Sequence, residues 1–168
     1  MTEAKRSDAS ATHRLAPIVG AFVAGAAGVL AFHQVTWWLL YVVGIIPDFS
    51  YRLKPTAPLG VPQVLSQAFW GGLWGIVLAA VLPLRGRVNY WVFAMAFGLI
   101  APTLVGWFVV PLIKGTPLMG GPPWIIQVVR PIPNIALGLG VALILRLLPS
   151  SLIWDDRTSQ RRESTAHA

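Results

Sequence analysis

The stretch of sequence that decides the fold is Leu15–Ile46, which reads LAPIVGAFVAGAAGVLAFHQVTWWLLYVVGII. Its 32 residues include no Asp, Glu, Lys or Arg. A helix needs about 20 apolar residues to cross a bilayer, so this stretch predicts a span that is tilted or that emerges on one side. It is too long for the core of a signal peptide, and no cleavage site of the Ala-x-Ala kind ends it cleanly. We therefore interpret it as a retained first span.

Two further apolar blocks follow the first one closely. Val64–Pro83 is uncharged over 20 residues, and Val88–Ile113 is uncharged over 26. The short link between them predicts a tight antiparallel hairpin of two helices. Pro102 lies inside the later block, and we expect it to kink that helix because proline lacks the backbone N–H.

The fourth apolar block, Trp124–Leu148, is the least regular one. Arg130 and several helix-disturbing residues fall in its first half. One interpretation is a kinked helix that starts at Pro123. The other is a span that starts near Pro131, where proline suits the first helical turn, with Trp124–Arg130 as an interfacial or re-entrant piece. We favour a kinked or broken fourth helix.

Composition supports a membrane protein. Of the 168 residues, 55% are hydrophobic and only 11% are charged, and the mean hydropathy is +0.66. Soluble domains carry about 25% charged residues. The predicted fold class is an all-α membrane protein with four transmembrane helices in an antiparallel bundle. The predicted domain covers 15–148, with spans at about 15–46, 64–83, 88–113 and 124–148, and with disordered cytoplasmic tails at 1–14 and 149–168.

The basic residues are distributed unevenly between the two predicted sides. The chain has 13 Lys and Arg against 6 Asp and Glu, a net charge of +7. With four spans, one side holds nine basic residues, the other holds three, namely Arg52, Lys54 and Lys114, and Arg130 is predicted at the membrane edge. Short loops rich in Lys and Arg stay in the cytoplasm, so both termini are predicted to be cytoplasmic. We expect these residues to meet anionic lipid headgroups rather than nucleic acid.

Small residues recur at four-residue spacing within the spans. This spacing places them on one face of a helix, where they let two backbones approach closely. The predicted packing residues are Gly71, Gly75, Gly98, Pro102, Gly106 and Gly138. Packing within a four-helix bundle is the simpler interpretation, and homo-oligomerisation through one of these faces is the alternative.

The sequence offers little catalytic chemistry. Cysteine is absent, so disulfides, thiolate metal sites and cysteine nucleophiles are excluded. No Asp or Glu lies in a predicted span, and intramembrane carboxylates are common in proton-coupled transporters. His33 is the one histidine in a span, whereas a bis-histidine haem needs two. Nucleotide-binding and hydrolase motifs are missing as well, so we expect neither a catalytic site nor a cofactor nor a metal.

Polar residues gather toward the predicted outer side, beneath two loops rich in Pro and Gly. We interpret this set as a candidate anion site, because the basic members outnumber the acidic ones there. Each member also has a structural explanation, since amides bond neighbouring helices and a long cationic side chain reaches outward to phosphate. The candidate residues are His33, Gln34, Arg52, Lys54, Lys114, Arg130 and Asn134.

Several short motifs resemble a group of small bacterial inner-membrane proteins, over roughly residues 16–148. They are Phe32-His33-Gln34, Pro58–Pro62, Phe69–Gly75, Gly98, Pro102-Thr103 and Pro111–Gly115. More distantly, the layout is similar to the YagU-like inner-membrane proteins, in which the third span also ends in Pro-Leu before a loop rich in Gly and Pro. The resemblance implies a multi-pass protein of the bacterial inner membrane, and it implies no activity.

Three functions are compatible with these features. The first is a non-enzymatic accessory or assembly subunit of a larger membrane complex. The second is a small transporter or channel, as a single copy or as a homo-oligomer, with a basic outer mouth. The third is a membrane enzyme or cofactor-bearing redox subunit, which the single span histidine does not favour.

Overall fold

A computed structural model describes residues 2–56, 59–121, 123–149 and 152, and of residues 2–14 it describes the backbone only. Four of the described helices are long and apolar enough to cross a membrane: Leu15–Val42, Gln63–Arg85, Tyr90–Lys114 and Trp124–Leu147. The prediction of a helical chain with four such helices is therefore confirmed.

The first of these helices is not regular throughout. It consists of α1 (Thr2–Gly28), a π-helical turn η1 (Val29–His33) and α2 (Gln34–Val42). Because α1 begins at Thr2, residues 2–14, for which we predicted disorder, are helical. Ala, Glu, Lys and Arg in this segment favour a helix. At the other end the helix stops at Val42, before Ile46, since Gly44 takes a left-handed φ of 75° that terminates it.

The second and third membrane-length helices are joined by a tight link. The second comprises α3 (Gln63–Val81) and the 3₁₀ turn η2 (Leu82–Arg85). The third comprises α4 (Tyr90–Leu104), a π-helical turn η3 (Val105–Val109) and α5 (Val110–Lys114). Two prolines, Pro102 and Pro111, lie on either side of η3. Each lacks an N–H donor, and a local π turn is one way in which membrane helices accommodate this loss.

The fourth helix is only slightly kinked. It comprises α6 (Trp124–Val129) and α7 (Pro131–Leu147), and Arg130 between them keeps helical angles of φ −54° and ψ −34°. The helix therefore does not break, and Trp124–Val129 extends it rather than forming a re-entrant piece. The predicted tail at 149–168 lies outside the described residues, apart from Pro149 and Leu152.

The first long loop contains a short strand pair and covers the start of α3. Strands β1 (Pro55–Thr56) and β2 (Val61–Pro62) are antiparallel, with Thr56 opposite Val61. The first two amides of α3 donate to this loop: Gln63 N to the Lys54 carbonyl and Val64 N to the Arg52 carbonyl, each at 3.0 Å. These bonds satisfy donors that have no partner inside the helix. The second long loop contains the 3₁₀ turn η4 (Leu118–Gly120).

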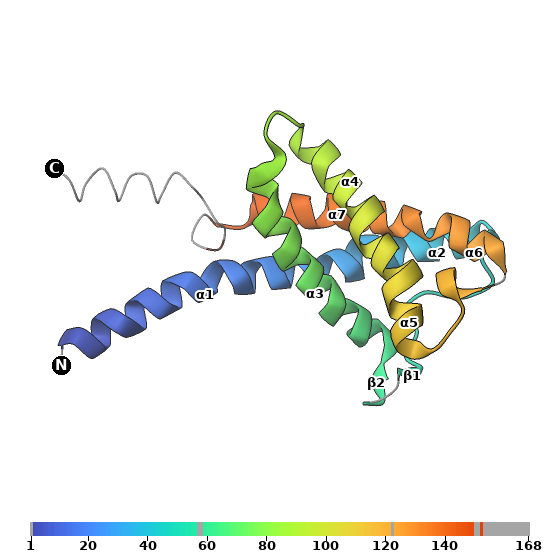
Figure 1. Ribbon diagram of the computed structural model, residues 1–168, viewed down its shortest axis with the longest axis horizontal. Coiled ribbons are helices and arrows are strands. Elements are labelled where there is room, and N and C mark those ends of the chain that lie inside the picture. The colour runs from blue at the N-terminus through green and yellow to red at the C-terminus, as the bar shows by residue number, and fades with distance from the viewer. Residues whose placement is uncertain (1, 57–58, 122, 150–151, 153–168) are drawn as a thin grey trace.

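The helices cross at wide angles rather than forming a parallel stack. In Figure 1, α1 and α7 run along the long axis of the molecule, and α3 and α4 cross in front of them. The β1–β2 pair and α6 lie at the end opposite to the N-terminus. The most extensive contacts join α1 to α3 and α4 to α7, and α1 also packs on α7.

Glycines form both main crossings. A Cβ atom built on Gly75 would lie 2.7 Å from the Cα atom of Gly25 in α1. In the other crossing, a Cβ atom on Gly138 would lie 3.2 Å from the Cα atom of Gly98 in α4. Gly71 belongs to the first crossing as well, since a Cβ there would be 2.9 Å from the Gly25 carbonyl oxygen. The backbones are therefore in direct contact, as the small-residue spacing predicts.

Gly106 and Pro102 differ from the other predicted packing residues. A Cβ on Gly106 would meet no atom within 4 Å, so this residue takes no part in a helix crossing. It lies about two turns beyond Gly98, where crossed helices have already diverged. It also lies within η3, which interrupts the four-residue spacing. Pro102 lines a small hollow beside the α4–α7 crossing.

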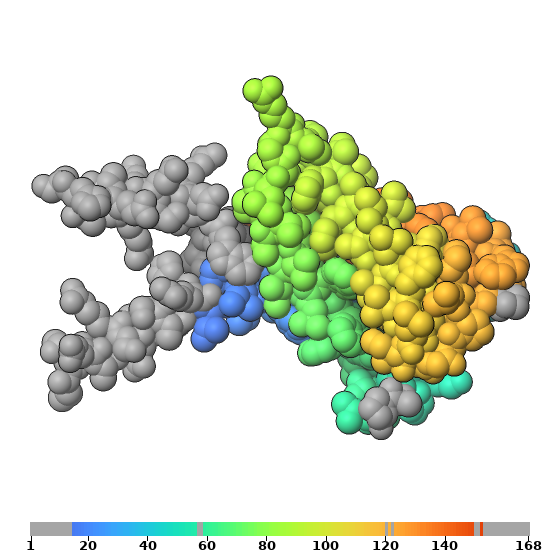
Figure 2. Space-filling view, in the orientation of Figure 1, coloured from blue at the N-terminus to red at the C-terminus, as the bar shows by residue number. Residues whose placement is uncertain are grey.

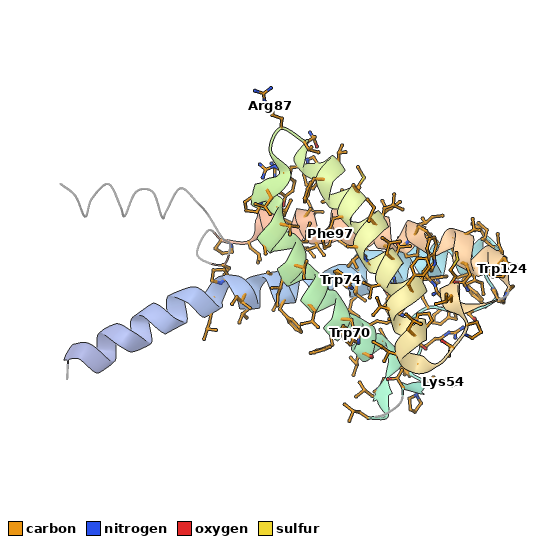
Figure 3. The ribbon with its side chains drawn as sticks, in the orientation of Figure 1. Lys54, Trp70, Trp74, Arg87, Phe97 and Trp124 are labelled. Carbon is orange, nitrogen blue, oxygen red and sulfur yellow. The ribbon has the colours of Figure 1, made fainter. Side chains whose placement is uncertain are left out.

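The two crossing pairs are built in the same way. In each pair, one helix carries a side-chain amide followed by two small residues at four-residue spacing. These residues are Gln67, Gly71 and Gly75 in α3, and Asn134, Gly138 and Ala142 in α7. Edge-to-face packing of Trp74 on Phe97, with ring centroids 5.9 Å apart, connects α3 to α4 between the pairs (Figure 3).

Candidate functional site

Gln34 is the centre of a polar network at the end of the bundle that faces the first long loop. It follows directly after η1, and only 2% of it is exposed. Its Nε2 atom donates to Oε1 of Gln67 in α3 at 2.6 Å. Its Oε1 atom accepts the backbone N–H of Tyr51 at 3.1 Å. One buried amide therefore connects two helices and a loop.

Tyr51 holds the first loop onto the π turn. Its hydroxyl donates to the Leu30 carbonyl within η1 at 2.7 Å. Its φ is +57°, a left-handed conformation that few residues other than glycine adopt and that costs about 1–3 kcal/mol. Sequence reasoning missed this residue, because its partners are backbone groups and a tyrosine carries no signal for a left-handed turn.

Asn134 and Gln127 make two further buried contacts. Asn134 Nδ2 donates to Oγ1 of Thr103 at 2.8 Å, which joins α7 to α4. Gln127 Nε2 donates to the Gly121 carbonyl at 3.1 Å, which holds the second loop against α6. Both amides therefore act as links between elements of the bundle.

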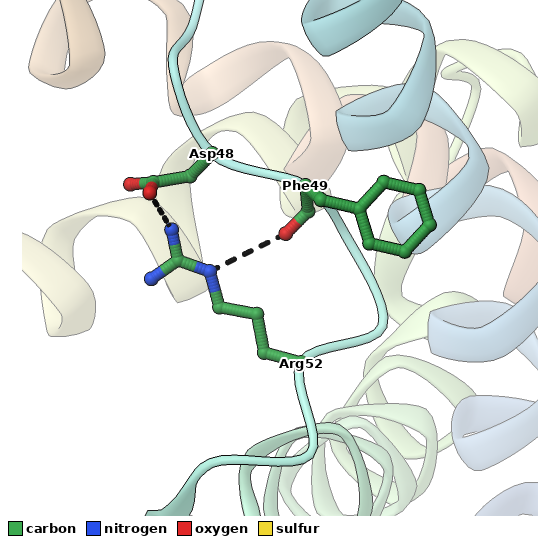
Figure 4. A network of polar contacts seen from close by, with 3 residues as sticks. All are labelled: Asp48, Phe49 and Arg52. Atoms are coloured by element: carbon green, nitrogen blue, oxygen red, sulfur yellow. Dashed lines mark hydrogen bonds and ion pairs between the residues drawn. The ribbon is translucent and has the colours of Figure 1, made fainter.

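The four cations of the candidate anion site do not share a common contact. Arg52 forms an ion pair with Asp48, and its Nε atom donates to the Phe49 carbonyl at 3.3 Å (Figure 4). This pair is confined to one turn of the first loop and is partly exposed, so it contributes little to stability. Lys54 and Lys114 are exposed, and Arg130 is half-buried between α6 and α7.

His33 lies close to the segment that carries Arg130. Its ring packs edge-to-face with Trp37, with centroids 6.3 Å apart. Trp37 packs in turn on a buried cluster that includes Leu40 of α2 and Val129, the residue before Arg130. The structure thus places α2 beside α6, although it gives no direct contact between His33 and Arg130.

Several polar atoms at this end are buried without a protein partner among the described residues. They are Nδ1 of His33, Oγ of Ser50, Nε1 of Trp107 and Oε1 of Gln127. Within the described part of the chain, no three His, Cys, Asp or Glu side chains gather closely enough to hold a metal ion. These atoms can therefore form hydrogen bonds with a bound polar molecule.

A double-mutant cycle on Gln34 and Gln67 tests the network. Gln34→Leu removes two bonds and Gln67→Leu removes one, so we expect Gln34→Leu to lower the free energy of unfolding more. Polar contacts between membrane helices couple by about 0.6 kcal/mol on average and by at most about 1.7 kcal/mol. Unfolding of the detergent-solubilised protein by SDS measures the coupling. Equal costs for the two variants would show that Gln34 does not hold the loop.

The surface of the described chain defines its class. Large apolar side chains are widely exposed, such as Ile113 at 80% and Leu112 and Val128 at 72% each. Helices α3 to α5 form much of the face seen in Figure 2. Four helices of membrane length that carry such a surface indicate a multi-pass membrane protein. Comparison with protein families, with characterised proteins and with solved structures finds no match.

Proposed function

We propose that this chain is a four-span protein of the bacterial inner membrane, with both termini in the cytoplasm, that works as an accessory or assembly subunit of a larger membrane complex. The location is supported by the four membrane-length helices and by the excess of basic residues on the side of the termini.

One observation carries the accessory role: the buried amides serve to connect parts of the bundle. Gln34 binds Gln67, Asn134 binds Thr103, and glycine backbones close both crossings. The hollow beside the α4–α7 crossing holds about 10 Å³, room for a single water molecule. Helix crossings closed in this way are suited to holding a fixed shape in the membrane.

The unpartnered buried atoms favour a second candidate, a small transporter or channel. His33 Nδ1, Trp107 Nε1 and Gln127 Oε1 belong to three different membrane-length helices. Such atoms would be satisfied by water or a polar solute, and an oligomer of small bundles can enclose a pore.

Purification in a mild detergent distinguishes the two candidates. We expect an affinity-tagged chain to elute with one large membrane partner in fixed stoichiometry. The partner should stay bound through size-exclusion chromatography, and the untagged chain should not recover it. A homo-oligomer without a partner would contradict the accessory role and favour the transporter. An absorbing cofactor in the purified sample would favour an enzyme instead.

A further inference from the structure

A second polar region, distant from Gln34, lies where α1, α3, η2, α4 and α7 meet. These elements enclose a hollow of about 270 Å³, which we call the basic hollow. Pro17, Leu82 and Leu145 supply apolar wall, and Arg85, Tyr90 and Arg146 supply its polar part. This volume is slightly below the range of pockets for drug-sized ligands, so it suits a headgroup or a short length of chain.

Two guanidinium groups share one aromatic ring in the basic hollow. The Cζ atom of Arg146 lies 4.5 Å from the ring centroid of Tyr90, and that of Arg85 lies 5.7 Å from it. Arg146 also lies 5.2 Å from the ring of Trp91. The Tyr90 hydroxyl donates to the Ala142 carbonyl at 2.8 Å, which fixes the ring between α4 and α7.

The arginines retain capacity for a ligand. A guanidinium has five N–H donors, and the recorded bond of Arg85 uses one of them, from Nη1 to the Leu82 carbonyl at 3.0 Å. Among the side chains that the structure describes, the one carboxylate is Asp48, which already pairs with Arg52 in the first long loop. The described residues therefore leave two adjacent positive charges for an anion.

We propose that the basic hollow binds one anionic phospholipid, with the headgroup phosphate held by Arg85 and Arg146 and an acyl chain against the apolar wall. Basic pockets between membrane helices bind such headgroups, and guanidinium groups match phosphate geometry. A soluble anion would need the arginines but not the apolar wall. The proposal rests on the membrane location proposed above and is independent of the accessory role.

Binding of phosphatidylglycerol and phosphatidylcholine, compared by native mass spectrometry of the full chain in mild detergent, tests this site. We expect one retained phosphatidylglycerol in preference to phosphatidylcholine. Each basic residue near a membrane surface strengthens the attraction about fivefold, so Arg85→Gln combined with Arg146→Gln should reduce the preference about 30-fold. Arg85→Lys combined with Arg146→Lys keeps both charges and should retain most of it.

Arg87→Gln is the matched control. Arg87 lies at the tip of the same link and points away from the bundle, so its loss removes one charge without touching the hollow (Figure 3). A loss in this variant as large as that in the single variants Arg85→Gln and Arg146→Gln, about fivefold, would overturn the proposal, because it would show general surface attraction. Displacement of the lipid by inorganic phosphate would identify a plain anion site, and would overturn it too.

One competing occupant lies within the chain itself. Asp155 and Asp156 follow shortly after Leu152, which also lines the basic hollow. Phosphatidylglycerol binding that appears only after deletion of residues 153–168 would assign the hollow to these acids and contradict the proposal. A chain without a stoichiometric partner would still show the lipid preference, so failure of the accessory role and failure of the lipid site are distinguishable.

Discussion

Replacing Gly75 by leucine is expected to lower the stability of the protein by at least about 3 kcal/mol. A Cβ atom at this position would collide with three backbone atoms of α1. It would lie 2.8 Å from N of Gly25 and 2.7 Å from Cα of Gly25. Backbone atoms cannot rotate away as a flexible side chain can, so α1 and α3 must separate. Inserting bulk into a packed core costs about 1–3 kcal/mol where side chains yield, and here the obstacle is the helix itself.

The loss is measurable as a fall in melting temperature of the detergent-solubilised protein, by roughly 6–12 °C for a chain of this length. Gly106→Leu is the matched control, since the same change there meets no atom within 4 Å. It should be neutral or slightly stabilising, because leucine favours a helix more than glycine does. Asn134→Leu, which removes one interhelical hydrogen bond, should cost only about 0.6 kcal/mol. A Gly75→Leu protein as stable as the parent would place this face of α3 toward lipid.

The sequence predicts the membrane-length helices because their signal is local. An uncharged stretch of 20 or more residues has few alternatives to a span. The crossings are also predictable in part. Small residues at four-residue spacing mark the helix face on which two backbones come close, and they correctly include Gly71, Gly75, Gly98 and Gly138. The spacing does not say which helix lies opposite, and it includes Gly106, which the η3 turn and the divergence of the helices leave in open space.

The remaining features depend on contacts between residues that are distant in sequence. The π turn η1 contains no proline, so nothing in its composition predicts an irregular helix there. The amide of Gln34 was predicted as a helix link, but its bond to the Tyr51 backbone depends on the path of a whole loop. The basic hollow forms only where five elements meet. In the sequence, Arg85 and Arg146 stand out only as two of the nine basic residues on the side of the termini. Both contact the ring of Tyr90, and for Arg146 this contact joins residues 56 positions apart.

Cysteine labelling is expected to give an all-or-none answer on the orientation in the membrane. The chain has no cysteine, so a single introduced thiol reports alone. Leu59 lies in the first long loop and is 83% exposed. Arg87 lies at the opposite end of α3 from Lys54, at the tip of the link to α4 (Figure 3). In intact cells, a membrane-impermeant maleimide should label Leu59→Cys and should leave Arg87→Cys unlabelled until the membrane is permeabilised.

The physical reason is the charge difference between the two sides of the four helices. Nine basic residues accompany the termini and the Arg85–Arg87 link, against three in the two long loops, and basic flanks are retained in the cytoplasm. Arg87→Cys lowers the larger number only to eight, so the substitution does not remove the bias that it reports on.

A reporter that is active only in the periplasm, fused after Ala168, should be silent for the same reason. Labelling of Arg87→Cys but not of Leu59→Cys in intact cells would contradict this prediction and show the opposite orientation. Arg85 and Arg146 would then lie in the outer leaflet, where the lipid preference of the basic hollow could still be measured.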